Sequence, residues 1–258
     1  MVVVKAKKNL GQHFLTDLSV ARRIVDSLPA NCSRVLEIGP GMGVLTQFLF
    51  QNSLLQAWAI DVDRESVAYL KERFPDHGDR LIEGDFLRFD PATLFGKEAF
   101  CVIGNFPYNI SSQILFAILD YRDRVPEVVG MFQKEVAERI ASPAGSKTYG
   151  ITSVLMQAWY DIDYLFTVHA HVFSPPPKVK SAVIRLKRNA TRELACDEKL
   201  FTRVVKTTFN QRRKMIRNSI KPLIKDDGFS HPYLERRPEQ LSVQEFIELT
   251  NAIIHIQK

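Results

Sequence analysis

Residues Arg34–Gly43, with the sequence RVLEIGPGMG, decide the fold. The first half predicts a short buried β-strand, and the alternating glycines of the second half predict a tight loop. Val44–Phe50 is mostly apolar and predicts a helix, so the local unit is a strand, a glycine loop and a helix. The glycines recur as G-x-G-x-G, not as the G-x-G-x-x-G that packs a pyrophosphate on a helix N-terminus. The loop therefore favours a nucleoside without a phosphate.

Acidic residues follow two later strands. Asp61 ends an apolar run about 20 residues beyond Gly41, where a carboxylate can accept hydrogen bonds from ribose hydroxyls. Asp85 follows another short strand, where it could accept a hydrogen bond from an adenine amine while Phe86 packs on the purine. A solvated strand end is the alternative interpretation of Asp61.

The residues NFPY at Asn105–Tyr108 follow an apolar run and suit chemistry on an aromatic amine. The amine of adenine delocalises its lone pair into the ring, so an enzyme that methylates it must accept its hydrogens and favour a pyramidal nitrogen. Asn105 offers a side-chain carbonyl, and Phe106 or Pro107 offers a backbone carbonyl. Pro107 fixes φ near −65°, and the ring of Tyr108 could stack on a base for about 1–3 kcal/mol. A tight turn after a buried strand is the alternative.

All these groups follow strands in chain order, and open α/β sheets bind ligands at the carboxyl ends of their strands. We therefore predict an α/β fold in which five strand–helix alternations, up to about Trp159, form a mostly parallel sheet with helices on both faces. Segments 160–169 and 181–187 are expected to close it as an antiparallel pair around a proline-rich loop at 173–179. Residues 1–15 are expected to form a basic, mobile arm.

Positive charge is concentrated towards the C-terminus. The formal net charge is +6 and the pI is near 9.2, and residues 198–258 carry 12 Lys or Arg against 7 Asp or Glu. Residues 199–225 hold nine basic side chains and no carboxylate, and a helix would place on one face Arg203, Lys206, Arg213, Lys214, Arg217 and Lys221. A basic face is often merely solvated. With Lys178 and Lys180 also basic, we expect RNA as the partner.

The polar stretch Asn189–Cys196 marks a domain boundary. An α/β domain is expected at 1–188 and a small helical, RNA-contacting domain at 189–258. Within the second, Arg212 falls on the apolar side of the helical projection, which predicts a break near Asn210 or Gln211 and two short helices.

Composition excludes several classes of protein. No apolar run approaches the ~18 residues of a membrane span, and early lysines interrupt any signal-peptide core, so a soluble, cytoplasmic protein is expected. The three cysteines are scattered without a C-x-x-C pair, and His169 and His171 have no further partner at ligand spacing. We expect neither a disulfide framework nor a bound metal.

Five motifs together resemble those of the small-subunit ribosomal RNA adenine dimethyltransferases: Asn9–Leu15, Glu37–Gly43, Gly84–Phe86, Gly104–Ser111 and Phe173–Val183. The resemblance spans nearly the whole chain. It implies a class I (Rossmann-like) methyltransferase that uses S-adenosylmethionine, with the catalytic domain at 1–188 and a helical domain at 189–258. It also implies dimethylation of two adjacent adenosines in a hairpin loop near the 3′ end of 16S rRNA. Neither a metal nor an obligate protein partner is expected.

The resemblance also assigns residues. Those expected to bind the cofactor are His13 and Leu15 over it, Gly39 at its methionine part, Asp61 at its ribose and Asp85 at its adenine, together with Gly41 and Phe86. Asn105 would touch both cofactor and target base, beside Pro107, while Tyr108 and Phe173 would cover the two faces of an extruded adenine. His13 departs from the commoner Asn, and Phe106 from the commoner Leu.

Related functions are alternatives at this stage. A DNA adenine methyltransferase shares the chemistry of the NFPY motif, and a large-subunit rRNA methylase of the macrolide-resistance type shares most of the fold. A binding factor that acts as a checkpoint on immature small subunits is the alternative from a different class.

Overall fold

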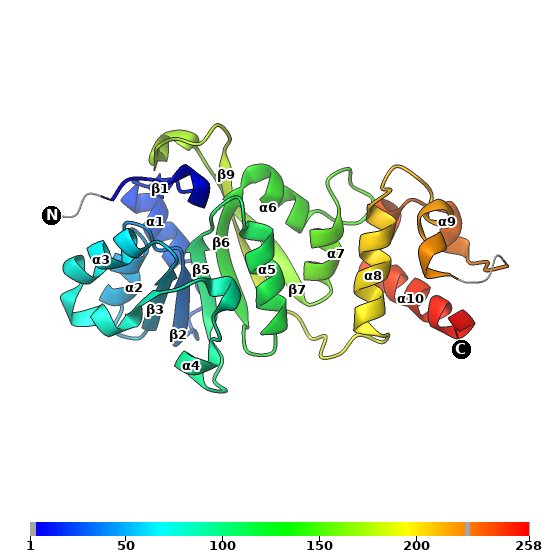
Figure 1. Ribbon diagram of the computed structural model, residues 1–258, viewed down its shortest axis with the longest axis horizontal. Coiled ribbons are helices and arrows are strands. Elements are labelled where there is room, and N and C mark those ends of the chain that lie inside the picture. Colours follow the sequence, from blue (N-terminus) through cyan, green and yellow to red (C-terminus); the bar gives the residue numbers. More distant parts are fainter. Residues whose placement is uncertain (1–3, 225–227, 258) are drawn as a thin grey trace. The chain divides into compact units, whose positions relative to one another are not determined.

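A computed structural model describes residues 4–224 and 228–257, and the chain divides into two compact units (Figure 1). The first unit comprises Met1–Ala137 and Ile162–Arg188, and the second comprises Glu138–Asp161 and Asn189–Lys258. The sequence predicts one domain over all of residues 1–188, whereas Glu138–Asp161 belongs to the second unit. That segment packs on the C-terminal helices, where the Tyr149 ring lies 6.2 Å from that of Phe209.

A seven-stranded sheet forms the centre of the first unit, in the order β4-β3-β2-β5-β6-β9-β7 (Figure 1). The strands are β2 Arg34–Ile38, β3 Gln56–Asp61, β4 Leu81–Glu83, β5 Cys101–Asn105, β6 Glu127–Gln133, β7 Tyr160–Val168 and β9 Ser181–Arg188. The pairs from β4 to β6 are parallel, and β9 runs antiparallel to β6 with Met131 opposite Val183. The mostly parallel sheet that the sequence predicts is therefore confirmed.

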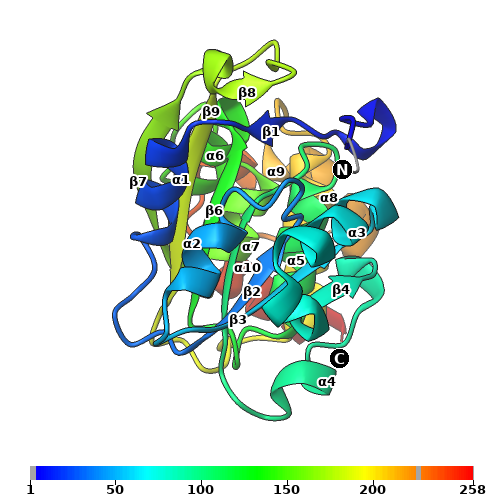
Figure 2. The same cartoon turned by 90° about the vertical axis from the view of Figure 1, so that its left-hand side faces the viewer.

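Helices cover both faces of this sheet because its strands are apolar on both sides. The helices of the first unit are α1 Leu18–Val25, α2 Thr46–Gln51, α3 Arg64–Arg73, α4 Ala92–Phe95 and α5 Ser111–Asp120; α6 Lys134–Ala141 begins there, and α7 Ile151–Gln157 belongs to the second unit. Alternate strand residues such as Val35, Ile103 and Val129 pack on α1 and α2. On the opposite face, the ring of Trp58 packs edge-on against that of Phe95 of α4, with the ring centroids 5.0 Å apart. Figure 2 shows α1 and α5 on opposite sides of the strands.

The N-terminal segment is held against the first unit over the residues that the structure describes. After the short helix η1 (Lys8–Leu10), β1 (Phe14–Leu15) pairs antiparallel with β8 (Phe173–Ser174), and Figure 2 shows the two strands side by side. The expectation of a mobile arm at 1–15 is therefore wrong for residues 4–15, because this pairing and long-range side-chain contacts hold them. Residues 1–3 lie outside the described residues.

Three helices organise the C-terminal part of the second unit: α8 Glu198–Phe209, α9 Ile216–Ser219 and α10 Val243–Gln257. The predicted break is confirmed, because α8 ends at Phe209 and a turn leads to α9. Val204 and Val205 of α8 are buried, as are Phe246 and Ile253 of α10. Within residues 4–224 and 228–257, no helix is long and apolar enough to cross a membrane.

Candidate active site

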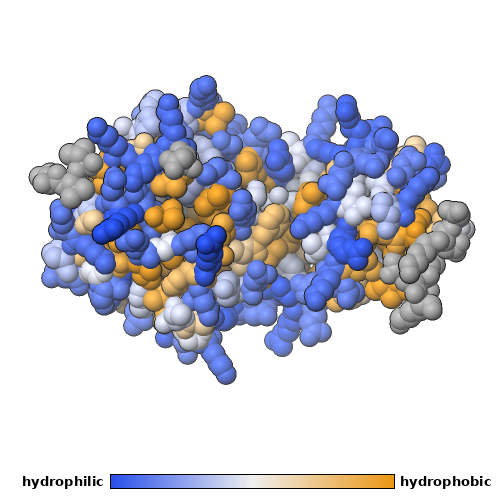
Figure 3. All heavy atoms as spheres, in the orientation of Figure 1, coloured by the Kyte–Doolittle hydropathy of each residue, from blue (hydrophilic) through white to orange (hydrophobic). Residues whose placement is uncertain are grey.

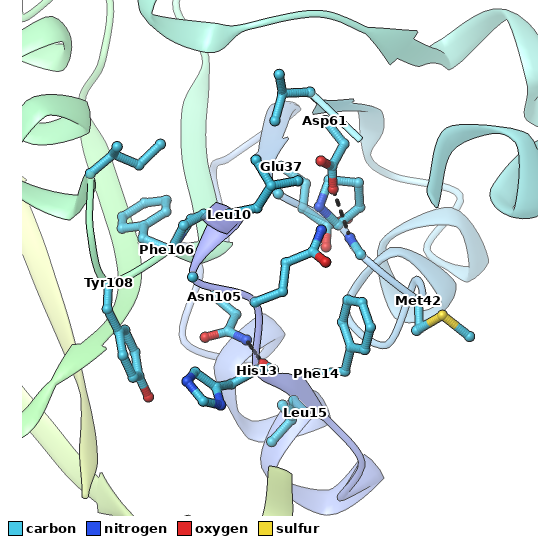
Figure 4. Close-up of a pocket in the computed structure, with 18 of the residues that line it drawn as sticks. Leu10, His13, Phe14, Leu15, Glu37, Met42, Asp61, Asn105, Phe106 and Tyr108 are labelled. Atoms are coloured by element: carbon cyan, nitrogen blue, oxygen red, sulfur yellow. Dashed lines mark hydrogen bonds between the residues drawn. The ribbon is translucent and has the colours of Figure 1, made fainter. Parts of the chain in front are cut away.

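A cavity of about 210 Å³ opens at the carboxyl ends of β2, β3 and β5 (Figure 4). Five segments contribute to its wall: residues 10–15, most of residues 37–45, the strand end at Asp61 and Val62, the strand end at Asp85 with Leu87, and residues 105–110. The order of the strands brings the last four of these segments together, since β2 lies between β3 and β5 and β4 lies beside β3. The pairing of β1 with β8 holds residues 10–15. The cavity lies where an open α/β sheet is expected to bind its ligand.

The glycine loop needs glycine at its two cavity-lining positions. Gly39 and Gly41 have φ of 70° and 53°, in the left-handed region that residues with a side chain rarely adopt. A Cβ atom on Gly41 would lie 2.9 Å from the Phe14 ring, and one on Gly39 would lie 3.6 Å from Cδ of Pro107. The loop backbone is therefore exposed to the cavity and lies close to both the N-terminal segment and the NFPY residues.

Asp61 holds this loop and also faces the cavity. Its Oδ2 accepts a hydrogen bond from the backbone N–H of Gly41 at 3.1 Å (Figure 4). Its Oδ1 accepts one from the N–H of Asp63 at 2.9 Å. Burial raises the pKa of Asp61, against the lowering effect of these two hydrogen bonds. Each carboxylate oxygen has a further lone pair, so Asp61 can still accept from a ligand hydroxyl.

Apolar side chains lie beside the second acidic strand end. Oδ1 of Asp85 accepts from the N–H of Leu87 at 3.0 Å, which caps the short helix η3 (Phe86–Arg88) and turns Leu87 towards the cavity. Phe86 is buried and does not line the cavity, so the structure does not bring it to the site as expected. Leu87 and Val62 provide the apolar wall instead. Val62 is 56% exposed.

Glu37 is a cavity residue that the sequence analysis missed. It is buried in β2, and its Oε2 accepts a hydrogen bond from the hydroxyl of Thr46 at 2.7 Å. Burial raises its pKa to about 8, so at neutral pH this carboxyl is mostly protonated. The sequence does contain an indication of this role, a carboxylate inside a strand that is otherwise apolar on both faces. Burying a carboxylate costs free energy unless it is hydrogen-bonded or paired, so its presence there points to a specific role.

The side-chain amide of Asn105 has a fixed orientation. Its Nδ2 donates to the backbone oxygen of His13 at 3.0 Å, which leaves Oδ1 as an acceptor (Figure 4). Pro107 O already accepts from the N–H of Ile110, whereas no described residue donates to Phe106 O. Of the two backbone carbonyls that the sequence left open, Phe106 O is therefore the available second acceptor.

Tyr108 is positioned from two sides. Its hydroxyl lies 2.6 Å from Oγ of the buried Ser181, and its ring centroid lies 5.4 Å from that of His13. Nδ1 of His13 in turn lies 2.8 Å from Pro175 O. Burial raises the pKa of Tyr108, so the phenol is neutral at pH 7.

Phe173 is not part of the cavity wall. It is 4% exposed, pairs with Leu15 across β1 and β8, and packs in the core with Val172. The expectation that Phe173 covers the second face of a base is not met in this structure, because strand pairing turns its ring inward. The ring neighbouring Tyr108 is that of His13.

The basic residues expected to contact RNA are exposed. Lys178 and Lys180 lie on the loop before β9. The other exposed residues lie on α8, the turn after it, α9 and the short helix η5 (Lys221–Leu223): Arg203, Lys206, Arg213, Lys214, Arg217 and Lys221. Figure 3 shows hydrophilic residues over the area where Figure 1 draws α8. Arg217 also pairs with Glu235 at 2.8 Å. Lys225 lies outside the described residues, and within those described no three His, Cys, Asp or Glu are grouped to hold a metal ion.

Comparisons with known proteins identify the family of the chain. The model of the ribosomal RNA adenine dimethylase family matches residues 3–253. The ribosomal RNA small subunit methyltransferase A of Cytophaga hutchinsonii is 59% identical over 256 residues, covering 98% of this chain and 99% of that protein. The protein of the same name from Bacteroides thetaiotaomicron is 60% identical over 256 residues, covering 98% and 96%.

Two solved structures share the fold. A dimethyladenosine transferase from Plasmodium falciparum superposes with a TM-score of 0.75 at 23% identity, covering 95% of this chain and 98% of that one. The 23S rRNA methyltransferase ErmE superposes with a TM-score of 0.64 at 24% identity, covering 92% and 99%. With a family model matched over nearly the whole sequence, this chain belongs to the ribosomal RNA adenine dimethylases.

Proposed function

We propose that this protein transfers methyl groups from S-adenosylmethionine to the exocyclic amine of adenosines in small-subunit ribosomal RNA. The observation that carries the proposal is the orientation of Asn105, whose Nδ2 is bound to His13 O so that Oδ1 remains an acceptor. Together with Phe106 O, it provides two acceptors for the two hydrogens of one amine. Two acceptors hold the nitrogen pyramidal and direct its lone pair away from the ring.

The cavity residues fit the proposed cofactor. The exposed backbone of the glycine loop permits close approach, and the free lone pairs of Asp61 suit ribose hydroxyls. Asp85, Val62 and Leu87 together offer a carboxylate and an apolar wall to a purine with an amine. S-Adenosylmethionine would supply a methyl carbon that already carries a good leaving group. The protein therefore needs to align the reacting atoms, and it needs no nucleophile of its own.

The target nucleotide must leave its stack, because a stacked adenine cannot present its amine to a buried cavity. The hydroxyl of Tyr108 is held by Ser181, so the ring already has a fixed orientation. Stacking of a base on it therefore costs no further ordering of the tyrosine. Stacking of this kind contributes about 1–3 kcal/mol and does not identify the base. Recognition of the amine then depends on Asn105 and Phe106. Phe173 is buried in the core and does not stack on the base in this proposal.

The choice of small-subunit RNA rests on close relatives. Proteins named ribosomal RNA small subunit methyltransferase A share 59–60% identity over 98% of this chain, whereas ErmE, a large-subunit enzyme by its name, shares 24%. The family resemblance further indicates two adjacent adenosines in the 3′-terminal hairpin loop, which would place the protein in the cytoplasm, where ribosomes are assembled. The basic residues of the second unit, with Lys178 and Lys180, are the proposed phosphate contacts.

One experiment separates the possible substrates. The protein is incubated with S-adenosylmethionine labelled in its methyl group and, separately, with unmethylated small subunits, large subunits and naked duplex DNA, and the modified bases are mapped. We expect label on two adjacent adenosines of the small subunit and none elsewhere. Label on large-subunit RNA or on DNA instead would overturn the proposed substrate. Binding to immature small subunits without any transfer would favour the checkpoint role over catalysis.

A further inference from the structure

The N-terminal segment forms one wall of the cofactor cavity. Residues 10–15 all line it, and Figure 4 shows Leu10, His13, Phe14 and Leu15 on that side. The C-terminal end of this segment is held by the pairing of β1 with β8. Its other end precedes η1 and has no strand partner among the described residues, so another interaction must hold it.

That interaction is a set of contacts on one buried carboxylate, Asp63. Nζ of Lys7 lies 2.7 Å from its Oδ1, and Nε2 of Gln12 donates to its Oδ2 at 3.1 Å. Beside this carboxylate, Nζ of Lys7 also lies 3.1 Å from Oε1 of the exposed Glu65. Oε1 of Gln12 accepts in turn from the backbone N–H of Lys7 at 2.9 Å. We call Lys7, Gln12 and Asp63 the clasp. It closes a ring of hydrogen bonds between two parts of the chain more than 50 residues apart.

The clasp is more deeply buried than an ordinary surface ion pair. The side chain of Asp63 is 1% exposed and that of Lys7 is 33% exposed, so solvent screens this pair less than an exposed one. Burial alone would raise the pKa of Asp63, but hydrogen bonds from Lys7, Gln12 and Ser66 hold it below its ordinary value. The carboxylate is therefore charged at neutral pH, and losing Lys7 would leave it buried without its cation.

The clasp is also connected to the cofactor carboxylate. The backbone N–H of Asp63 donates to Oδ1 of Asp61 at 2.9 Å, while Oδ2 of Asp61 binds the N–H of Gly41. Ser66 and the N–H of Glu65 fix Asp63 from α3. One short, well-ordered connection therefore links the N-terminal segment, the proposed ribose ligand and the glycine loop.

We propose that Lys7, Gln12 and Asp63 are positioning residues that hold the N-terminal segment closed over the cofactor, so that cofactor binding and closure of this segment are coupled. The inference rests on the proposed function for the identity of the cofactor. Coupling of this kind is reciprocal: the closed segment raises the affinity for the cofactor, and the bound cofactor stabilises the closed segment. A contact that merely stabilises the fold would not show this reciprocal coupling between cofactor binding and closure of the segment.

The test uses the full-length protein with Lys7→Met, Gln12→Ala and Asp63→Asn, and with Lys5→Met as the matched control. Lys5 is an exposed lysine on the same segment. Dissociation constants for S-adenosylmethionine and S-adenosylhomocysteine are measured by calorimetry, and amide hydrogen exchange is followed without cofactor. We expect Lys7→Met to raise both constants by about 5- to 150-fold. We also expect faster exchange in residues 8–15 and unchanged exchange in β5. Lys7→Arg should keep most of the affinity.

A double-mutant cycle decides whether the residues act together. If Lys7 acts through Asp63, the double variant Lys7→Met with Asp63→Asn binds no more weakly than the weaker single variant. Additive losses overturn the proposal, as does a constant for Lys7→Met within twofold of the wild type. Faster exchange throughout the sheet would make the clasp a general stabiliser and would also overturn it. If the wild type binds neither compound, the proposed function fails, while the exchange of residues 8–15 still tests the clasp.

Discussion

Replacing Gly41 with alanine should weaken cofactor binding in addition to destabilising the fold. The backbone term is modest, because a residue with a side chain in the left-handed region costs about 1–2 kcal/mol. The steric term is specific to this position: the new Cβ would lie 2.9 Å from two carbons of the Phe14 ring, well inside normal contact. Phe14 lines the cavity, so its ring must shift in the wall that faces the cofactor.

The magnitude follows from the usual cost of overpacking. Forcing extra carbon atoms into a packed site costs about 1–3 kcal/mol, which corresponds to about a 5- to 150-fold rise in the dissociation constant if the bound state carries that cost. Calorimetry with S-adenosylhomocysteine measures this rise, and urea unfolding measures the stability of the same protein.

Gly96→Ala is the matched control. Gly96 also has a positive φ, 56°, but nothing lies within 4 Å of its added Cβ, and it ends α4 away from the cavity-lining residues. This variant should lose stability and keep its cofactor affinity. A dissociation constant for Gly41→Ala within twofold of the wild type would refute the reasoning, because the loop could then not be the surface against which the cofactor packs.

Three further predictions concern single groups of the site and the basic surface. Asp61→Asn should raise the cofactor dissociation constant, because one oxygen that serves both loop and ligand is replaced by an amide nitrogen; an unchanged constant in calorimetry would mean that the ribose is held elsewhere. Changing Arg213, Lys214 and Arg217 to alanine should weaken RNA binding and make it less dependent on salt. In filter binding from low to high salt, the slope of log binding constant against log salt concentration should become shallower by about 0.7–0.9 for each phosphate that these side chains neutralise. An unaltered slope would mean that these residues do not contact RNA. Because burial raises the pKa of Glu37 from 4.5 to about 8, the unfolded chain releases this proton at a pH where the folded protein keeps it, so the free energy of unfolding should fall as pH rises from about 4.5 to 8. Glu37→Gln should remove that fall in urea titrations, and an equal pH dependence in both proteins would contradict it.

Much of the fold could be predicted because its signals are local. Gly39 follows β2, and Asp61 and Asn105 are the last residues of β3 and β5. Parallel strands bring their carboxyl ends to one edge of the sheet whatever the details of packing. The break after α8 was visible because Arg212 interrupts an otherwise apolar arc. The second acceptor could not be chosen from sequence, since only the turn that binds Pro107 O to Ile110 distinguishes it from Phe106 O.

Other features depend on contacts between distant parts of the chain. The inward turn of Phe173 follows from its pairing with Leu15, more than 150 residues away, and no local pattern contains that information. The same holds for the clasp between Lys7 and Asp63, which turns an apparently mobile arm into a wall of the cavity. For Phe86 the reason is local: Asp85 caps a one-turn helix that points Leu87, and not Phe86, at the cavity.

The claim on which the proposed chemistry depends is that Asn105 Oδ1 accepts a hydrogen of the target amine. The measurement is single-turnover methyl transfer by Asn105→Ala to unmethylated small subunits at saturating S-adenosylmethionine, with the cofactor dissociation constant measured on the same protein. Removing one such transition-state hydrogen bond should slow transfer by about 10²–10³-fold, while the dissociation constant changes by less than about tenfold. Transfer at a rate close to that of the wild type would contradict the account.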